Sequence, residues 1–279
     1  MSERFCAFSF VDRITSFAPG VSAAGRYTIP AGVDAFPPAL VAEAVGQLAA
    51  WAAMARLDFA FRPVAGLAGE LAFNGDVAPG QTLDLSVSIE HCDAEAIAYD
   101  GSASVDGARV LTLAHSVGPM LRMEEFDAPA ALRADLEVLR GPGAPAARFR
   151  GVPARTVRVI ERTPGERWRA ELQVPAAASF FDDHFPRRPV FPGTLLLDTH
   201  LALAAQLAAE TAPLRDAGAL RPARAIDMKL RAFIPPGQGL ELRLEVQTAT
   251  PTAAMIAITT RMNGKSVSTG RAEIAPRAS

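Results

Sequence analysis

The chain has 279 residues, of which 49% are hydrophobic and 21% charged, as is typical of a globular protein with about two domains. Its 28 basic and 30 acidic residues give a net charge of −2, without the basic excess of nucleic-acid-binding proteins. Two cysteines, Cys6 and Cys92, exclude a disulfide framework and a four-cysteine zinc site. The longest apolar stretch, 39–55, carries Glu43 and is short for a membrane span, so we expect a cytoplasmic protein.

The first predicted elements are two strands separated by the turn dipeptide Pro19-Gly20. Residues 38–56 are apolar on nearly all sides of a helix, which predicts a buried helix. Polar and apolar residues then alternate over 83–90, as in a strand with one buried face. Asp106-Gly107 is a strong hairpin signal between two further strand-like runs.

A segment rich in Ala, Pro, Gly and Arg follows, at about 128–150. Its first part, up to Arg140, is a candidate linker helix, and the run from Gly141 to Pro153 is predicted to be extended. We expect this segment to connect two domains, 1–127 and 151–279.

The remainder of the chain repeats the first part. Three dipeptides recur at offsets of 145 to 157 residues: Pro19-Gly20 with Pro164-Gly165, Phe36-Pro37 with Phe191-Pro192, and Asp106-Gly107 with Asn263-Gly264. A second apolar helix is predicted at about 193–211, and residues 240–246 alternate like 83–90. The repeat therefore predicts an α+β fold of two tandem domains, each an antiparallel sheet wrapped around one long apolar helix.

The most specific motif lies before the second helix. Residues 180–193 read FFDDHFPRRPVFPG, and Asp198 follows His184 by 14 residues. This segment resembles the active-site signature of the beta-hydroxyacyl-(acyl carrier protein) dehydratases, in which a His-Phe-Pro loop precedes a Pro-Gly helix start and a helical carboxylate. The resemblance extends over essentially the whole chain, once per half. It implies two hot-dog domains packed as a pseudo-dimer.

The sequence departs from the family pattern in two ways. Arg187 stands where the family usually has Gly, which is costly if that position requires a positive φ. The first half is also 10 residues shorter between Pro30 and Pro37 than the second half is between Pro175 and Pro192. The missing residues include the histidine loop, and Pro38 replaces Gly193.

The resemblance implies a role for each of three residues. His184 would act as the base, because a neutral imidazole can take a proton from C2 of a thioester near neutral pH. The backbone N–H of Gly193 would stabilise the charge on the thioester oxygen. In the family's homodimers the carboxylate comes from the other subunit, which here implies Glu43 from the first half. Asp198 would then mark a second, vestigial or repurposed site.

Simpler interpretations remain for several of these residues. His184 could be a turn histidine held by hydrogen bonds, and Glu43 a partly solvated helix residue, although a buried glutamate is unusual without a partner or a task. Arg187 and Arg188 are candidates for binding the phosphopantetheine phosphate or an acidic carrier protein, or are solvated. Adjacent Asp182, Asp183 and His184 make a poor metal site, so we expect no metal or cofactor.

The resemblance implies a dehydratase acting on (3R)-hydroxyacyl thioesters in fatty-acid or polyketide synthesis. Acyl carrier protein is favoured over coenzyme A as the carrier, and double-bond isomerisation is a candidate secondary activity. A hot-dog thioesterase and a non-catalytic acyl-binding or scaffold subunit are the alternatives. Neither the acyl chain length nor further assembly into a homo-oligomer follows from the sequence.

Overall fold

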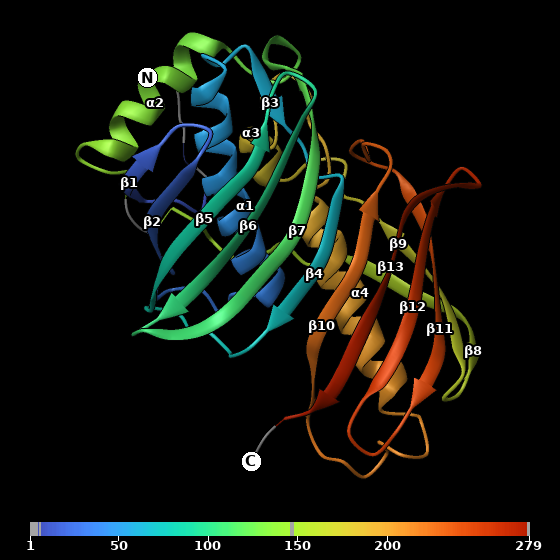
Figure 1. Ribbon diagram of the computed structural model, residues 1–279. Coiled ribbons are helices and arrows are strands. Elements are labelled where there is room, and N and C mark those ends of the chain that lie inside the picture. The colour runs from blue at the N-terminus through green and yellow to red at the C-terminus, as the bar shows by residue number, and fades with distance from the viewer. Residues whose placement is uncertain (1–4, 6, 146–147, 278–279) are drawn as a thin grey trace.

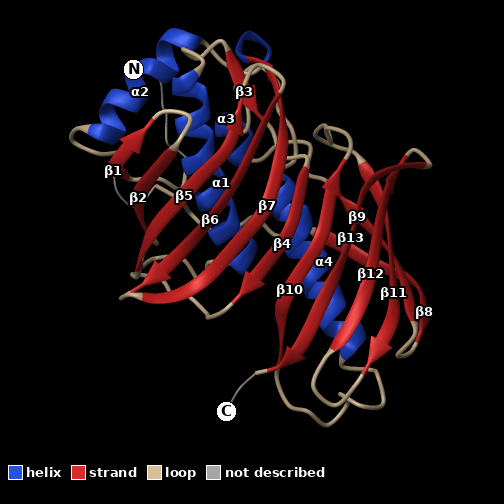
Figure 2. Ribbon diagram, in the orientation of Figure 1, coloured by secondary structure: helices blue, strands red, loops and turns tan. Residues whose placement is uncertain are grey.

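The computed structural model describes residues 5, 7–145 and 148–277, so Cys6 lies outside the described residues. Antiparallel strands form one continuous sheet, and the two long helices α1 (Pro38–Arg56) and α4 (Gly193–Ala208) pack against it (Figures 1 and 2). Each half of the sheet curves around one of these helices. This is the predicted α+β arrangement of two tandem hot-dog units.

The strands of the first half are β1 (Arg13–Ala18), β2 (Ser22–Thr28), β3 (Phe61–Pro63), β4 (Leu67–Phe73), β5 (Thr82–Cys92), β6 (Ala96–Val105) and β7 (Ala108–Arg122). Those of the second half are β8 (Thr156–Thr163), β9 (Arg167–Gln173), β10 (Leu220–Leu230), β11 (Gly239–Ala249), β12 (Ala254–Met262) and β13 (Lys265–Pro276).

The strand order demonstrates the repeat. It runs β1-β2-β5-β6-β7-β4 in the first half and continues β10-β13-β12-β11-β9-β8 in the second, so one order is the mirror of the other. The halves join where β4 pairs antiparallel with β10, while β3 pairs only with β7. Two units related in this way bring the N-terminal ends of their core helices close to a shared interface.

Both predicted hairpins are present. Asp106 and Gly107 have φ values of 50° and 80°, and Asn263 and Gly264 have 50° and 76°. Positive φ at both central positions is the type I′ geometry that matches the twist of the flanking strands. The first turn joins β6 to β7 and the second joins β12 to β13.

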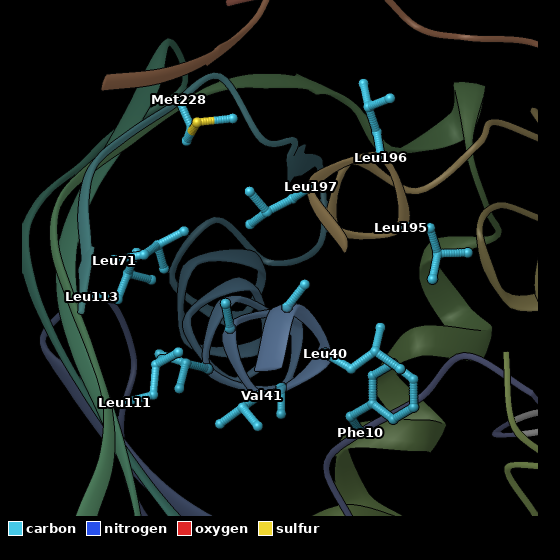
Figure 3. Packing of buried hydrophobic residues seen from close by; sticks show 14 of the residues in the cluster. Phe10, Leu40, Val41, Leu71, Leu111, Leu113, Leu195, Leu196, Leu197 and Met228 are labelled. Atoms are coloured by element: carbon cyan, nitrogen blue, oxygen red, sulfur yellow. The ribbon is translucent and has the colours of Figure 1, made fainter. Parts of the chain in front are cut away.

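The core helices are buried as their composition predicts. The first, α1, has a length and composition that would suit a membrane span, but 61% of that stretch is buried inside the protein. The second, α4, ends at Ala208, three residues before the predicted end. Figure 3 shows Leu71, Leu113, Leu197 and Met228 facing one another beside α1, from both halves of the molecule.

The linker packs on the first half. Its predicted helix is α2 (Pro129–Arg140), which buries Leu132, Leu136 and Leu139. Further along, the Phe149 ring lies against the rings of Phe10 and Phe36, at centroid distances of 5.2 and 5.6 Å. The linker therefore contributes to the core close to the start of α1.

Candidate active site

A cavity of about 530 Å³ extends between the two halves. From α1 it is lined by Glu43, Gly46, Gln47, Ala50 and Met54, which recur once per helical turn. From α4 it is lined by Gly193, Leu196, Leu197 and His200, with the same spacing. His184 also lines it, so the cavity contains all three residues of the predicted site, which we call the His184 site: His184, Glu43 and Gly193.

His184 directly follows the short helix α3 (Phe180–Asp183). Its Nδ1 atom lies 3.1 Å from the carbonyl oxygen of Val190, which can only accept, so Nδ1 carries the proton and Nε2 keeps its lone pair. Burial lowers the pKa of His184 below its usual value of 6.5, and the negative charge of Glu43 opposes this shift. The ring is therefore a neutral imidazole at neutral pH, the form required of a base.

Both carboxyl oxygens of Glu43 accept hydrogen bonds. The Thr194 hydroxyl donates to Oε2 at 2.7 Å, and the Gln47 amide donates to Oε1 at 3.0 Å. Thr194 belongs to the second half, so this contact holds the carboxyl group against the start of α4. Gln47 is fixed in turn, because its Oε1 accepts from the N–H of Phe10 at 2.7 Å and its Nε2 donates to the carbonyl of Phe8 at 2.9 Å.

Gly193 is the first residue of α4, where backbone N–H groups have no partner within the helix. A Cβ atom at this position would lie 2.3 Å from Cδ1 of Leu230, so any larger residue would require the Leu230 side chain to move. The equivalent residue of α1, Pro38, has no N–H to offer. Only the second half therefore presents a helix N-terminus with this donor.

An N-terminal segment, Ala7–Phe10, crosses the site. Oδ2 of Asp183 accepts the N–H groups of Ala7 and Phe8, at 2.8 and 2.7 Å. The Phe8 ring packs edge-on against the His184 ring, with centroids 5.6 Å apart. The segment thus connects the residue before His184 to Gln47, the neighbour of Glu43. Sequence reasoning considered Asp183 only as a poor metal ligand and missed Phe8 and Thr194. The four-residue spacing of Gln47 from Glu43 was an available signal.

Asp198 has a different environment. Its Oδ2 forms an ion pair with Nη2 of Arg155, and Nη1 of Arg155 donates to the carbonyl of Leu195 at 2.5 Å. Both side chains are 17% exposed. Asp198 is not among the described residues that line the cavity. Asp198 therefore lies outside the cavity that Glu43 and His184 share, and its role as a vestigial or repurposed carboxylate stays a prediction.

The two arginines of the histidine loop contact the end of the first half. Arg188 forms an ion pair with Glu125 at 2.7 Å, and Nη1 of Arg187 donates to the carbonyl of Glu124 at 3.1 Å. Arg187 is not among the described residues with positive φ, so the loop accommodates it without the strain anticipated from the missing glycine. No cluster of three or more metal-ligating side chains occurs in the described part of the chain.

Sequence comparison with known proteins gives matches over part of the chain. A family model, ApeI-like, described as ApeI dehydratase, matches residues 160–271. A 3-hydroxyacyl-(acyl-carrier-protein) dehydratase FabZ from Ruminiclostridium cellulolyticum is 32% identical over 120 residues, which is 42% of this chain and 82% of that protein. The chain belongs to the 3-hydroxyacyl-(acyl-carrier-protein) dehydratase family. Another dehydratase of this family, FabZ from Myxococcus xanthus, is 33% identical over 90 residues, which is 32% of this chain but only 59% of that relative.

Solved structures show the fold of this family member over more than nine tenths of its length. A tesB protein from Mycobacterium avium subs paratuberculosis has a TM-score of 0.60 and 15% identity, with 95% of this chain and 96% of that chain covered. A putative oleoyl thioesterase from Lactobacillus plantarum has a TM-score of 0.59 and 8% identity, with 92% and 97% covered. At these identities the likeness establishes the double hot-dog fold and no reaction.

Proposed function

We propose that the protein is a hydro-lyase that converts (3R)-hydroxyacyl thioesters to trans-2-enoyl thioesters and water. The observation that carries this proposal is that His184 and Glu43 come from opposite halves and line one cavity at the N-terminus of α4. A neutral base, a carboxyl group and a free backbone N–H at one place are what this elimination requires.

The reaction would proceed as follows. The thioester oxygen binds at the Gly193 N–H, and Nε2 of His184 takes a proton from C2. The C3–O bond breaks while Glu43, which enters this step in its protonated form, donates its proton to the departing hydroxyl; the hydroxyl leaves as water, and the C2–C3 bond becomes double. Return of the proton from His184 to Glu43 restores the starting state, so no oxidant or cofactor is consumed.

The rest of the cavity suits an acyl chain. Leu71, Leu113, Leu197 and Met228 line it with apolar side chains, and its volume is in the range of small-molecule sites. We propose acyl carrier protein as the carrier, in line with the names of the sequence relatives. Arg187 and Arg188 stay candidates for its contact, although each already contacts residues 124–125.

Two readouts of one reaction test this function. The protein is incubated with a 3-hydroxyacyl thioester, and the conjugated enoyl product is followed by its absorbance while free thiol is measured in parallel. A dehydratase gives enoyl product without thiol, whereas a thioesterase gives thiol without enoyl product. Neither product with either acyl carrier protein or coenzyme A substrates would instead support the non-catalytic acyl-binding alternative and refute the proposal.

A further inference from the structure

A tyrosine that the mechanism above does not use lies beside Glu43. Tyr99 of β6 lines the cavity, and its hydroxyl oxygen lies 3.3 Å from where a Cβ atom would stand on Gly46. Gly46 is three residues beyond Glu43 on the same face of α1, a rise of about 4.5 Å. Glycine inside a helix costs roughly 1 kcal/mol relative to alanine, and here it leaves room for the Tyr99 hydroxyl next to the carboxyl group.

A second hydroxyl group lies behind Tyr99. Ser116 of β7 is the cross-strand partner of Tyr99, is 3% exposed and also lines the cavity. Burial and the negative charge of Glu43 raise the pKa of Tyr99, so Tyr99 stays protonated. The Ser116 hydroxyl oxygen has no hydrogen-bond partner among the described residues. The Tyr99 O–H is a donor that can bind a group in the cavity.

We propose that Tyr99 binds the 3-hydroxyl group of the substrate beside Glu43 and holds the water molecule that this hydroxyl becomes. The proposal rests on the dehydratase function above and names a substrate-binding residue for it. With the thioester oxygen at Gly193 and C2 at His184, the oxygen on C3 must face Glu43. The Tyr99 hydroxyl lies against Gly46, less than one helical turn beyond Glu43, and can bind that oxygen from a second side. Glu43 and Tyr99 together would then fix the direction in which the C3–O bond breaks.

The matched pair of variants is Tyr99→Phe and Tyr27→Phe, which remove one hydroxyl from each of the two tyrosines of the chain. Tyr27 is 3% exposed, its hydroxyl has no partner among the described residues, and it does not line the cavity. Both variants are made in a His184→Ala background so that bound substrate is not converted. Affinities are measured for 3-hydroxyoctanoyl-coenzyme A and for octanoyl-coenzyme A, which lacks only the 3-hydroxyl group.

We expect Tyr99→Phe to weaken binding of the hydroxylated thioester by about 3- to 10-fold, the range for one uncharged hydrogen bond, and to leave octanoyl-coenzyme A unchanged. Tyr27→Phe should leave both affinities unchanged. Equal losses for both thioesters in Tyr99→Phe, or no loss for either, would overturn the proposal. Failure of the dehydratase function itself would appear separately, as an absence of enoyl product from the wild-type chain, and does not depend on this binding preference.

Discussion

The two halves of the molecule share a strand order but use their equivalent helix carboxylates differently. In the His184 site, Glu43 accepts hydrogen bonds from Thr194 and Gln47 and lines the cavity. Its equivalent, Asp198, is neutralised by Arg155. The Glu43 carboxyl group lies in the cavity and accepts from uncharged donors, whereas Asp198 forms an ion pair and is not among the described residues that line the cavity. The same fold therefore places one carboxylate in the cavity and the other in an ion pair.

Two residues before β8 contact the equivalents of His184-site residues: Phe149 of the linker and Arg155, which directly precedes the strand. The repeat places Phe36 and Asp198 where Phe191 and Glu43 lie in the His184 site. Together with Phe149 and Arg155 they form what we call the counterpart site. Phe149 packs on Phe36, and Arg155 pairs with Asp198. The first half lacks the residues that would supply a histidine loop there.

The largest expected effect comes from removing the base of the His184 site. His184→Ala should lower dehydration by about 10²- to 10⁴-fold, because no other histidine of the cavity adjoins Glu43. Folding should persist, since the residue lies in a loop between α3 and α4. His91→Ala, at an exposed histidine, is the control. Turnover of His184→Ala close to the wild-type value would refute the assignment.

The next effect distinguishes the two carboxylates. Glu43→Gln keeps the side-chain size but cannot supply a proton, so turnover should fall by about 10²-fold. Asp198→Asn should leave turnover near the wild-type value but destabilise the fold by about 1–3 kcal/mol, because Arg155 loses its charged partner in a partly buried position. Product formation and denaturant unfolding measure the two effects. The reverse ranking in turnover would show that the second half contains its own complete site.

A smaller effect is expected from the N-terminal segment, which has a defined role only in the His184 site. Asp183→Ala removes the acceptor of the Ala7 and Phe8 N–H groups and frees the Phe8 ring from His184. Turnover should fall by about 10-fold, since small misplacements of catalytic groups are costly. Asp216→Ala, at an exposed carboxylate that does not line the cavity, is the control. Equal activity of both variants would show that the segment does not position His184.

Local and repeating signals predicted most of the fold. The apolar composition of residues 38–56 and 193–211 predicted both core helices, and the dipeptides Asp106-Gly107 and Asn263-Gly264 predicted both hairpins. Each of these helices and hairpins depends on residues that are neighbours in the sequence. The residues that complete the site could not be found in this way. Asp183 contacts Ala7 across 176 positions and Thr194 contacts Glu43 across 151, and no short-range pattern encodes such pairs. Likewise, Asp198 pairs with Arg155 across 43 positions.

The two halves also differ at one core position, because α4 has His200 where the repeat places Val45 in α1. His200 is fully buried, with Nε2 2.7 Å from the Thr260 hydroxyl, and burial lowers its pKa to about 3. The folded protein keeps this ring neutral, while the unfolded chain binds a proton below its usual pKa of 6.5. Stability from this group is therefore complete above pH 6.5 and is lost as the pH falls toward 3. By pH 5 the loss is about 2 kcal/mol, because each pH unit in that window contributes about 1.4 kcal/mol.

His200→Val, which gives α4 the residue of α1, should remove this part of the acid destabilisation. The difference in unfolding free energy between pH 7.5 and pH 5 is the measurement, since it cancels the cost of the altered packing. The lowered pKa of His184 leaves a residual dependence in the variant. An unchanged difference between the two pH values would mean that His200 is not held neutral and that the second half does not depend on pH through its core.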